Sequence, residues 1–274
     1  MSKIVSALIV SCVSAACSPI FAQIHVINDA VVRNHGGFPY KITEPGAYRL
    51  DGNLTLNRDT DAIVVNTDHV TINLNGFSIT GPVVCTLPDS TKGVSCPTGG
   101  KGVGIRSGSL TTGLGANRDV KVSNGSIHGM GLHGVFLEGD GSMVEKVSAD
   151  FNGGFGLLVN GLVTASSGNA NGQVGIFAVT VRDSSALNNT GDGMVIDGIG
   201  GISTGNIASF NGGNGINLPN GTAIGNTIVR NVLFGVVTRC PAVLSSNSII
   251  NNTGGSIDIQ QGDNCALVNN STLP

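Results

Sequence analysis

Apolar and polar positions alternate in a repeated block of about twenty residues along the second half of the chain. Six asparagines are each followed by a glycine four positions later, and these glycines recur every 18 to 22 residues. Two apolar positions separated by one residue follow each glycine, which is the spacing of a strand with one buried face. Short strands, Asn/Gly turns and this period together predict a stacked solenoid. The repeated pairs begin at Asn152, Asn171, Asn189, Asn211, Asn231 and Asn251 and reach Gly156, Gly175, Gly193, Gly215, Gly235 and Gly255.

Aligned on the glycines, the repeats give two inward apolar columns and a third inward column of mostly small residues that fits a tight corner. Stacked asparagines at the turns can hydrogen-bond along their column. The position between the two inward columns should point outward, yet it is mostly apolar, so we expect something to cover it. The 82–118 loop, another subunit or a sugar ring could do so. The outward column consists of Phe136, Leu158, Phe177, Val195, Asn217 and Val237.

This pattern predicts one all-β domain, a single-stranded parallel β-helix of about ten coils. A propeller blade needs about twice the repeat length, and a sandwich does not keep one residue type in register over six repeats. We expect the helix over 46–265, with an N-terminal cap over 23–45 and a C-terminal tail over 266–274. The stretch 82–118 interrupts the repeat and is predicted to be an inserted loop.

Composition limits the function classes. Glycine makes up 42 of 274 residues, only 11% are charged, and the formal charge is −3, which argues against a nucleic-acid-binding protein. Residues 1–22 have the pattern of a signal peptide, with Lys3 before an apolar core too short to span a bilayer. The segment ending at Cys17 also fits a lipoprotein leader, so a secreted or periplasmic protein and an outer-membrane lipoprotein are both open. No later segment is expected to cross a membrane.

Four cysteines follow the leader: Cys85, Cys96, Cys240 and Cys265. An even number in an exported chain indicates two disulfides, and local pairing is the simplest of the three possible connectivities. A metal site is the competing interpretation, but neither a CxxC motif nor clustered histidines accompany these cysteines.

The run PGAYRLDGNLTL (45–56), the segment VTINLNGFSITGP (70–82) with two cysteines after it, and NGSIHGMG (124–131) carry a resemblance. The chain resembles exported bacterial right-handed parallel β-helix proteins with repeats of the pectin-lyase-like superfamily, a group of largely unassigned function. The resemblance covers almost all of the mature chain and implies a right-handed helix. The superfamily contains enzymes acting on pectin, alginate and other polysaccharides, as well as tailspikes and adhesins, so it implies a carbohydrate ligand only by analogy of fold.

Catalytic residues are weakly indicated. Glycoside hydrolysis needs two carboxyl groups across one bond, and uronate lysis needs a base with a cation, but the acids here are scattered singly. The densest polar segment, 126–141, contains His128 and His133, and the repeat places His128 opposite Asp150 on the next coil. A carboxylate beside a histidine could orient a general base, whereas an exposed cross-strand pair is the structural alternative. Asp59 and Asp61 could contribute to a Ca²⁺ site, but a solvated turn fits them better, and we predict no metal or other cofactor.

The protein could instead bind a ligand without catalysing a reaction. Five basic residues lie between positions 92 and 121, among them Lys101, Arg106 and Arg118, and such a segment could hold an anionic glycan. Phe136 and Phe177 could stack against sugar rings. We therefore predict an exported binding scaffold, with anionic polysaccharide or a cell-surface component as partner and no nucleic acid. The alternatives are a polysaccharide lyase or hydrolase with an atypical site, and a self-associating, adhesin-like protein that forms homo-oligomers through the apolar column.

Overall fold

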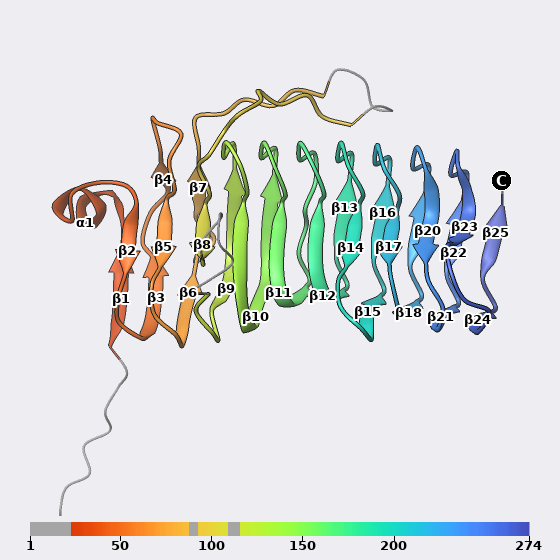
Figure 1. Cartoon of the computed structure of the whole chain (residues 1–274). Helices are drawn as coiled ribbons and strands as arrows, with labels where there is room; N and C mark the ends of the chain where they lie inside the picture. Colours follow the sequence, from red (N-terminus) through yellow and green to blue (C-terminus); the bar gives the residue numbers. More distant parts are fainter. Residues whose placement is uncertain (1–22, 88–92, 109–115, 274) are drawn as a thin grey trace, which may run out of the picture.

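The computed structural model describes residues 23–87, 93–108 and 116–273, so the predicted leader and its Cys17 lie outside it. The backbone winds into a parallel β-helix of about eleven turns, stacked in one row from the N-terminal to the C-terminal end (Figure 1). The predicted fold is confirmed. Each complete coil contributes three strands, where the repeat had suggested two, and the strands form three parallel sheets that we call faces A, B and C.

Face A follows the repeated glycine. Its strands are β2 (Tyr40–Ile42), β5 (Ile63–Val65), β8 (Ile105–Ser107), the first parts of β10 (Val135–Asp150), β11 (Leu157–Thr164) and β12 (Ile176–Arg182), then β14 (Met194–Ile196), β17 (Ile216–Leu218), β20 (Phe234–Thr238) and β23 (Gly255–Ile259).

Face B comes next in each coil. Its strands are β1 (Ile24–Ile27), β3 (Gly46–Leu50), β6 (Val70–Asn73), the first part of β9 (Lys121–His128), the later parts of β10, β11 and β12, then β15 (Gly201–Thr204), β18 (Gly221–Ile224), β21 (Ala242–Ser245) and β24 (Cys265–Val268).

Face C closes the coil. Its strands are β4 (Leu54–Thr55), β7 (Ser78–Thr80), the ends of β9 and β10, then β13 (Ser185–Leu187), β16 (Ile207–Ser209), β19 (Thr227–Val229), β22 (Ser248–Ile250) and β25 (Ser271–Leu273).

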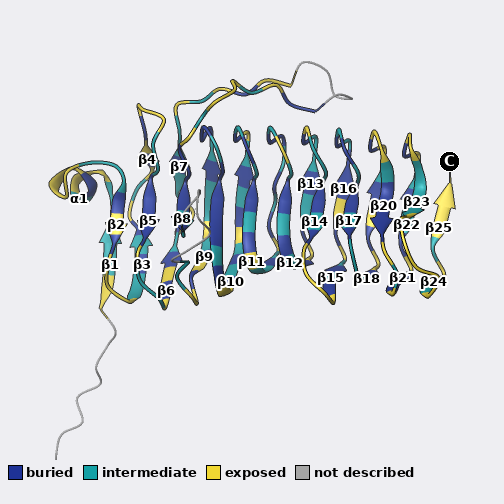
Figure 2. Ribbon diagram, viewed as in Figure 1, coloured by how far each residue is buried: buried dark blue, intermediate teal, exposed yellow. Residues whose placement is uncertain are grey.

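The core fills the space between the three faces, and the predicted inward columns are buried (Figure 2). Ile176 and Ala178, for example, have no exposed surface. The glycine column is required by the stacking distance. A Cβ on Gly156 would lie 2.6 Å from the carbonyl oxygen of Gly175 on the next coil, and the same clash recurs along the column. Any larger residue there would force the coils apart.

Buried asparagines satisfy the backbone at the corner between faces C and A. Asn171 donates from Nδ2 to Ala149 O at 2.9 Å, and its own N–H donates to Asn189 Oδ1 at 2.9 Å. This arrangement repeats from coil to coil, so the predicted asparagine column is present. Its members are Asn152, Asn171, Asn189, Asn211, Asn231 and Asn252.

The last member differs from the prediction. Asn252, not Asn251, enters the column, and Val236 pairs with Ile257, so the final coil is displaced by one residue. Ser256 therefore stands where earlier coils have glycine. Its Cβ is tolerated because no described coil lies against it. The shift was not predicted because the Gly254–Gly255 doublet also places a glycine four residues after Asn251.

A second polar column lies at the corner between faces B and C and was not predicted. Each member accepts a backbone N–H from the preceding coil, as Asn226 Oδ1 does from Asn206 at 3.0 Å. The column begins with serines and continues with asparagines. Its members are Ser166, Ser184, Asn206, Asn226, Asn247 and Asn270.

The insertion leaves the helix after β7 and returns before β8 as an extended arm along the corner between faces C and A (Figure 1). The predicted Cys85–Cys96 disulfide ties the arm into a loop. Thr190 Oγ1 donates to Val94 O at 2.7 Å, which fixes the arm over the turns of later coils. The described part of the insertion therefore covers this corner. In the outward column of face A, Phe136 and Val237 are buried and the other four members are half-buried.

The strands continue beyond both expected boundaries. β1 and β2 already form coil within the segment expected as a cap, and β25 lies in the expected tail. Among residues 23–45, the helix α1 (Asp29–Asn34) covers the N-terminal end, with Asn28 Oδ1 accepting the Val31 N–H at 3.0 Å. At the other end, the predicted Cys240–Cys265 disulfide joins the last two coils. Among the described residues, no helix has the length and apolar character of a membrane span.

Candidate functional site

A cavity of about 310 Å³ opens on the outer surface of face A, beside its corner with face B. Phe177 and Leu158 form its apolar wall, because they alternate with inward residues of β12 and β11 and pair across the ladder. Glu138, Asn160 and Asp197 form its polar wall. An apolar floor beside amide and carboxylate groups suits a ligand with one apolar face and hydroxyl groups on its rim.

The polar wall is held in place by hydrogen bonds. Asn160 Nδ2 donates to Glu138 O at 3.0 Å and to Asp140 Oδ1 at 3.1 Å. Glu138 Oε2 is buried and has no hydrogen-bond partner among the described residues. Burial also raises the pKa of the Glu138 carboxyl, so this group takes up a proton at a higher pH than an exposed glutamate. Glu138 therefore adds to the polar wall a carboxyl group whose Oε2 no described residue hydrogen-bonds.

Aromatic rings continue from the cavity along the coils. Phe177 and Phe155 are 6.2 Å apart and nearly parallel, and His133 stacks on Phe155 at 5.1 Å and on Phe136 at 5.6 Å. Phe136 is only 5% exposed, which leaves little of its ring for a sugar, so its role in stacking stays a prediction. Phe177 is partly exposed. The burial of Phe136 could not be read from alternation, which placed it correctly on the outer surface.

His133 belongs to this packing. It is 8% exposed, and its Nδ1 accepts the Phe155 N–H at 3.0 Å. Burial lowers the pKa of His133 to about 4, so the ring is neutral near pH 7 and its Nδ1 lone pair is already used. The structure therefore gives His133 a packing role, and its candidacy as a general base is not supported.

His128 and Asp150 are opposite each other in register, as predicted, but they lie on face C. His128 Nε2 is 3.1 Å from Thr80 Oγ1. Asp150 accepts hydrogen bonds from Ser148 Oγ and the Asn169 N–H. Burial raises the pKa of the Asp150 carboxyl, against the lowering effect of these hydrogen bonds and of His128. The pair is thus on a different face from the cavity and cannot act on the same bond as Glu138 or Asp197.

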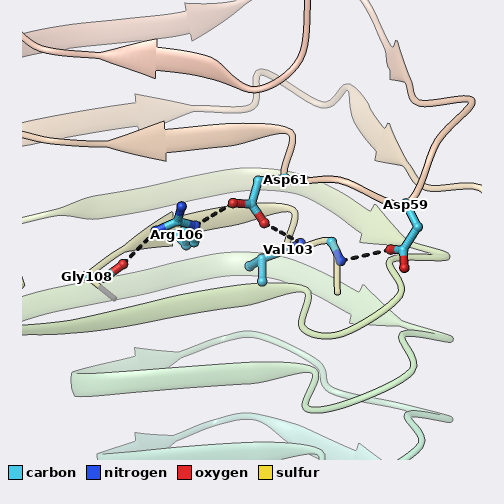
Figure 3. Close-up of polar contacts among 6 residues, drawn as sticks. Asp59, Asp61, Val103, Arg106 and Gly108 are labelled. Carbon is cyan, nitrogen blue, oxygen red and sulfur yellow. Dashed lines mark hydrogen bonds and ion pairs between the residues drawn. The ribbon is translucent and has the colours of Figure 1, made fainter. Parts of the chain in front are cut away.

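One cation of the basic segment is paired with an acid from the preceding coil. Arg106 Nε donates to Asp61 Oδ2 at 2.5 Å and its Nη1 to Gly108 O at 2.7 Å, while Asp61 Oδ1 accepts the Val103 N–H at 3.0 Å (Figure 3). Arg106 is consequently engaged within the protein. Its role in holding an anionic ligand stays a prediction, and the guanidinium would have to leave Asp61 to fulfil it.

Backbone N–H groups of this segment also bind acids. Asp59 accepts the Lys101 and Gly102 N–H groups at 2.8 Å, and Asp68 accepts the Arg118 N–H at 2.9 Å. This hydrogen bond from Arg118 holds the pKa of the Asp68 carboxyl below its ordinary value. Asp59 and Asp61 are therefore backbone-binding groups rather than a solvated turn.

The polar wall of the cavity was missed as a site. Glu138, Asn160 and Asp197 occupy the position four residues after Gly134, Gly156 and Gly193, so the repeat alignment contained the signal. Within the described residues, no group of three or more histidine, cysteine, aspartate or glutamate side chains is arranged to hold a metal ion.

Comparison with known proteins shows the fold. No protein-family model and no curated protein sequence matches the chain. Among solved structures it is similar to the A-module of mannuronan C-5 epimerase AlgE4 from Azotobacter vinelandii, with a TM-score of 0.57, 14% identity, and coverage of 92% of this chain and 85% of that one. The AlgE6 A-module from the same organism has a TM-score of 0.49, 16% identity, and coverage of 80% and 60%.

A periplasmic alginate epimerase, AlgG, has a TM-score of 0.48 and 12% identity, with coverage of 85% of this chain and 76% of that one. The likeness to the AlgE4 A-module supports the parallel β-helix fold. At such identities they bear on architecture alone.

Proposed function

We propose that the protein is an exported β-helix scaffold that binds a polysaccharide on face A, at the cavity between Phe177 and Glu138. The observation that carries this proposal is the partly exposed Phe177 ring beside a fixed row of amide and carboxylate groups. The apolar face of a sugar ring can stack on Phe177 while its hydroxyl groups bond to Asn160 and Asp197. The two disulfides support a location outside the cytoplasm.

The fold supports the ligand class. The structure with the TM-score of 0.57 belongs to a mannuronan C-5 epimerase module, which is a protein that acts on a polysaccharide. In this chain, however, the cavity is lined by the carboxyl groups of Glu138 and Asp197, and the Arg106 guanidinium is paired with Asp61. We therefore expect a neutral glycan to bind better than an anionic one near pH 7.

Affinity electrophoresis in gels containing neutral or anionic polysaccharides tests this proposal. A neutral glycan should retard the protein, and Phe177→Ala should weaken its binding by about tenfold, the scale of one lost stacking contact. Val195→Ala is the matched control, because Val195 pairs with Phe177 on the next coil but does not line the cavity. Equal loss in both variants, or retardation by anionic gels alone, would contradict the proposed site.

A second candidate function is glycoside hydrolysis at the same cavity. It is favoured by Glu138, whose raised pKa suits a general acid, lying in one cavity with the Asp197 carboxylate, which could activate water. The wild-type protein should then release new reducing ends from a bound glycan, and Glu138→Gln should abolish the release while leaving binding intact. Binding without any release leaves the protein a scaffold.

A further inference from the structure

A second cavity, of about 590 Å³, lies along the outer side of the corner between faces B and C. It is larger than the cavity of about 310 Å³ beside Phe177, and its volume is within the range of about 300–1,000 Å³ that is usual for ligand sites. It crosses five consecutive coils, from Gly125 to Ile207. The two cavities share no lining residue, so the second one is a separate feature of the molecule.

The cavity is formed where a short corner residue lies between two charged ones. Lys146, Ala165 and Asp183 occupy equivalent corner positions on three consecutive coils, with φ values of 53°, 48° and 49°. Lys146 and Asp183 are exposed, and the methyl group of Ala165 leaves open the space between their side chains. The corner therefore contains a hollow with a cation at one rim and an anion at the other.

Serine hydroxyl groups form the floor of this hollow. Ser148, Ser167 and Ser185 occupy one outward position of face C on three consecutive coils, where they pair in register. All three side chains are half-buried. Because each hydroxyl group can donate one hydrogen bond and accept two, this floor offers polar groups to a ligand along the direction in which the coils stack.

A chain of hydrogen bonds orients two of these hydroxyl groups. Ser167 Oγ donates to Ser148 Oγ at 3.1 Å, and Ser148 Oγ donates to the Asp150 carboxylate. Asp150 is itself held by the Asn169 N–H at 2.9 Å. Both hydroxyl protons are thus directed toward Asp150, and the lone pairs of Ser167 remain to accept hydrogen bonds from a ligand.

The charges at the rims favour a neutral ligand. The Lys146 ammonium is paired with the Glu145 carboxylate at 3.3 Å, and Asp183 lies at the other rim. A polyanion would be repelled by the Asp183 carboxylate, whereas the hydroxyl groups of a neutral sugar can donate hydrogen bonds to it. Ala165 and Ile207, which is 46% exposed, add apolar surface for the C–H groups of a sugar ring.

We propose that this cavity binds a second neutral glycan, so that one protein molecule holds two polysaccharide strands. Hydroxyl groups of the glycan would donate to Ser167 Oγ and to the Asp183 carboxylate. Face B separates this cavity from the one beside Phe177, so a straight glycan segment cannot occupy both. The bridging of two strands, though not the second site itself, rests on the proposed binding at Phe177.

Isothermal titration calorimetry with β-1,4-linked trisaccharides of glucose and of mannose counts the sites. Ser167→Phe is the test variant, because its ring would fill the cavity and its outward position should leave the fold and the circular dichroism unchanged. We expect the wild type to bind two trisaccharides per chain. Ser167→Phe and Phe177→Ala should each bind one, and the double variant should bind none.

Ser248→Phe is the matched control, because Ser248 occupies the same outward column on a coil beyond the cavity. It should leave both sites intact. Two trisaccharides on Ser167→Phe, or an equal loss in Ser248→Phe, would overturn the second site. A wild type that binds no trisaccharide, or only the one that Phe177→Ala removes, would also overturn it. If Phe177→Ala changes nothing and Ser167→Phe removes binding, the second site is supported and the proposed binding on face A fails.

Bridging is tested separately by light scattering from galactomannan, a neutral polysaccharide. The wild type should join galactomannan chains into larger particles, and Ser167→Phe or Phe177→Ala should each abolish this growth. Particles that do not grow with the wild type, or that still grow with either variant, would overturn the bridging of two strands.

Discussion

The side chains of Asn171 and Asn189 are joined across adjacent coils, with Asn171 Nδ2 donating to Asn189 Oδ1 at 3.1 Å. The same Asn189 oxygen accepts the Asn171 N–H, and both residues are fully buried. Each amide thus binds backbone groups of the preceding coil and the side-chain amide of the following one. The column converts a corner of unpaired peptide groups into a continuous hydrogen-bonded row, as stacked amides do in other parallel β-structures.

The one-residue shift of the last coil gives a matched pair of variants. Asn252→Gly removes the acceptor of the Asn231 N–H and the donor to Ile228 O, both buried, so it should lower the free energy of unfolding by about 2 kcal/mol. Asn251→Gly changes an exposed residue at φ 56°, which glycine tolerates, so the change should be within about 0.5 kcal/mol. Urea titration measures both. Equal effects, or the reverse order, would contradict the register described here.

The ion pair of Asp61 with Arg106 offers a second test. Asp61→Asn leaves a half-buried guanidinium without its counter-charge, and we expect a loss of about 2 kcal/mol in the free energy of unfolding. Replacing both residues, as in Asp61→Asn with Arg106→Met, should recover part of this loss because no unpaired charge remains. Thermal and urea unfolding of the two single variants and the double variant complete this double-mutant cycle. If the two single changes in the free energy of unfolding simply add in the double variant, the residues do not interact.

His133 links stability to pH. Its pKa in the folded protein is about 4, below the ordinary value of 6.5, so the unfolded chain binds the proton more strongly. Stability from the neutral ring is therefore complete above pH 6.5 and decreases as the pH falls toward 4. Between pH 7.5 and pH 4.5, this one group should cost about 2.5 kcal/mol.

The comparison with His133→Leu isolates this contribution, since the other titrating groups remain in both proteins. The free energy of unfolding of the wild type should fall with acidification by about 2.5 kcal/mol more than that of the variant. Parallel pH profiles would mean that His133 is protonated in the folded protein, which is incompatible with its packing between Phe136 and Phe155.

Much of the fold could be predicted from the sequence, because every coil of a β-helix must meet the same packing and hydrogen-bonding requirements. Asn171 and Gly175 recur in register because each must fit the same amide column and the same close contact with the next coil. The shift at Asn252 was not predicted because Gly255 follows Asn251 at the spacing of the earlier repeats. The third strand of each coil escaped because only one of its positions faces inward.

The candidate functional site was harder to predict from the sequence. Arg106 was expected to be free because its partner Asp61 lies 45 residues earlier and only the coil stacking brings the two together. Phe136 and Phe177 occupy the same sequence column, but His133 packs beside Phe136 and leaves Phe177 to line the cavity. The alternation of residues along a strand predicts which side of the sheet a side chain is on. It does not predict which other residues cover that side chain.

A crystal structure of the protein with a bound oligosaccharide from its preferred glycan tests the central claim most directly. The account predicts a sugar ring stacked on Phe177, with carbon atoms within about 4.5 Å of the ring and hydroxyl groups on Asn160 or Asp197. Density for the glycan over His128 and Asp150 on face C, or along Lys101 and Arg118, would contradict it.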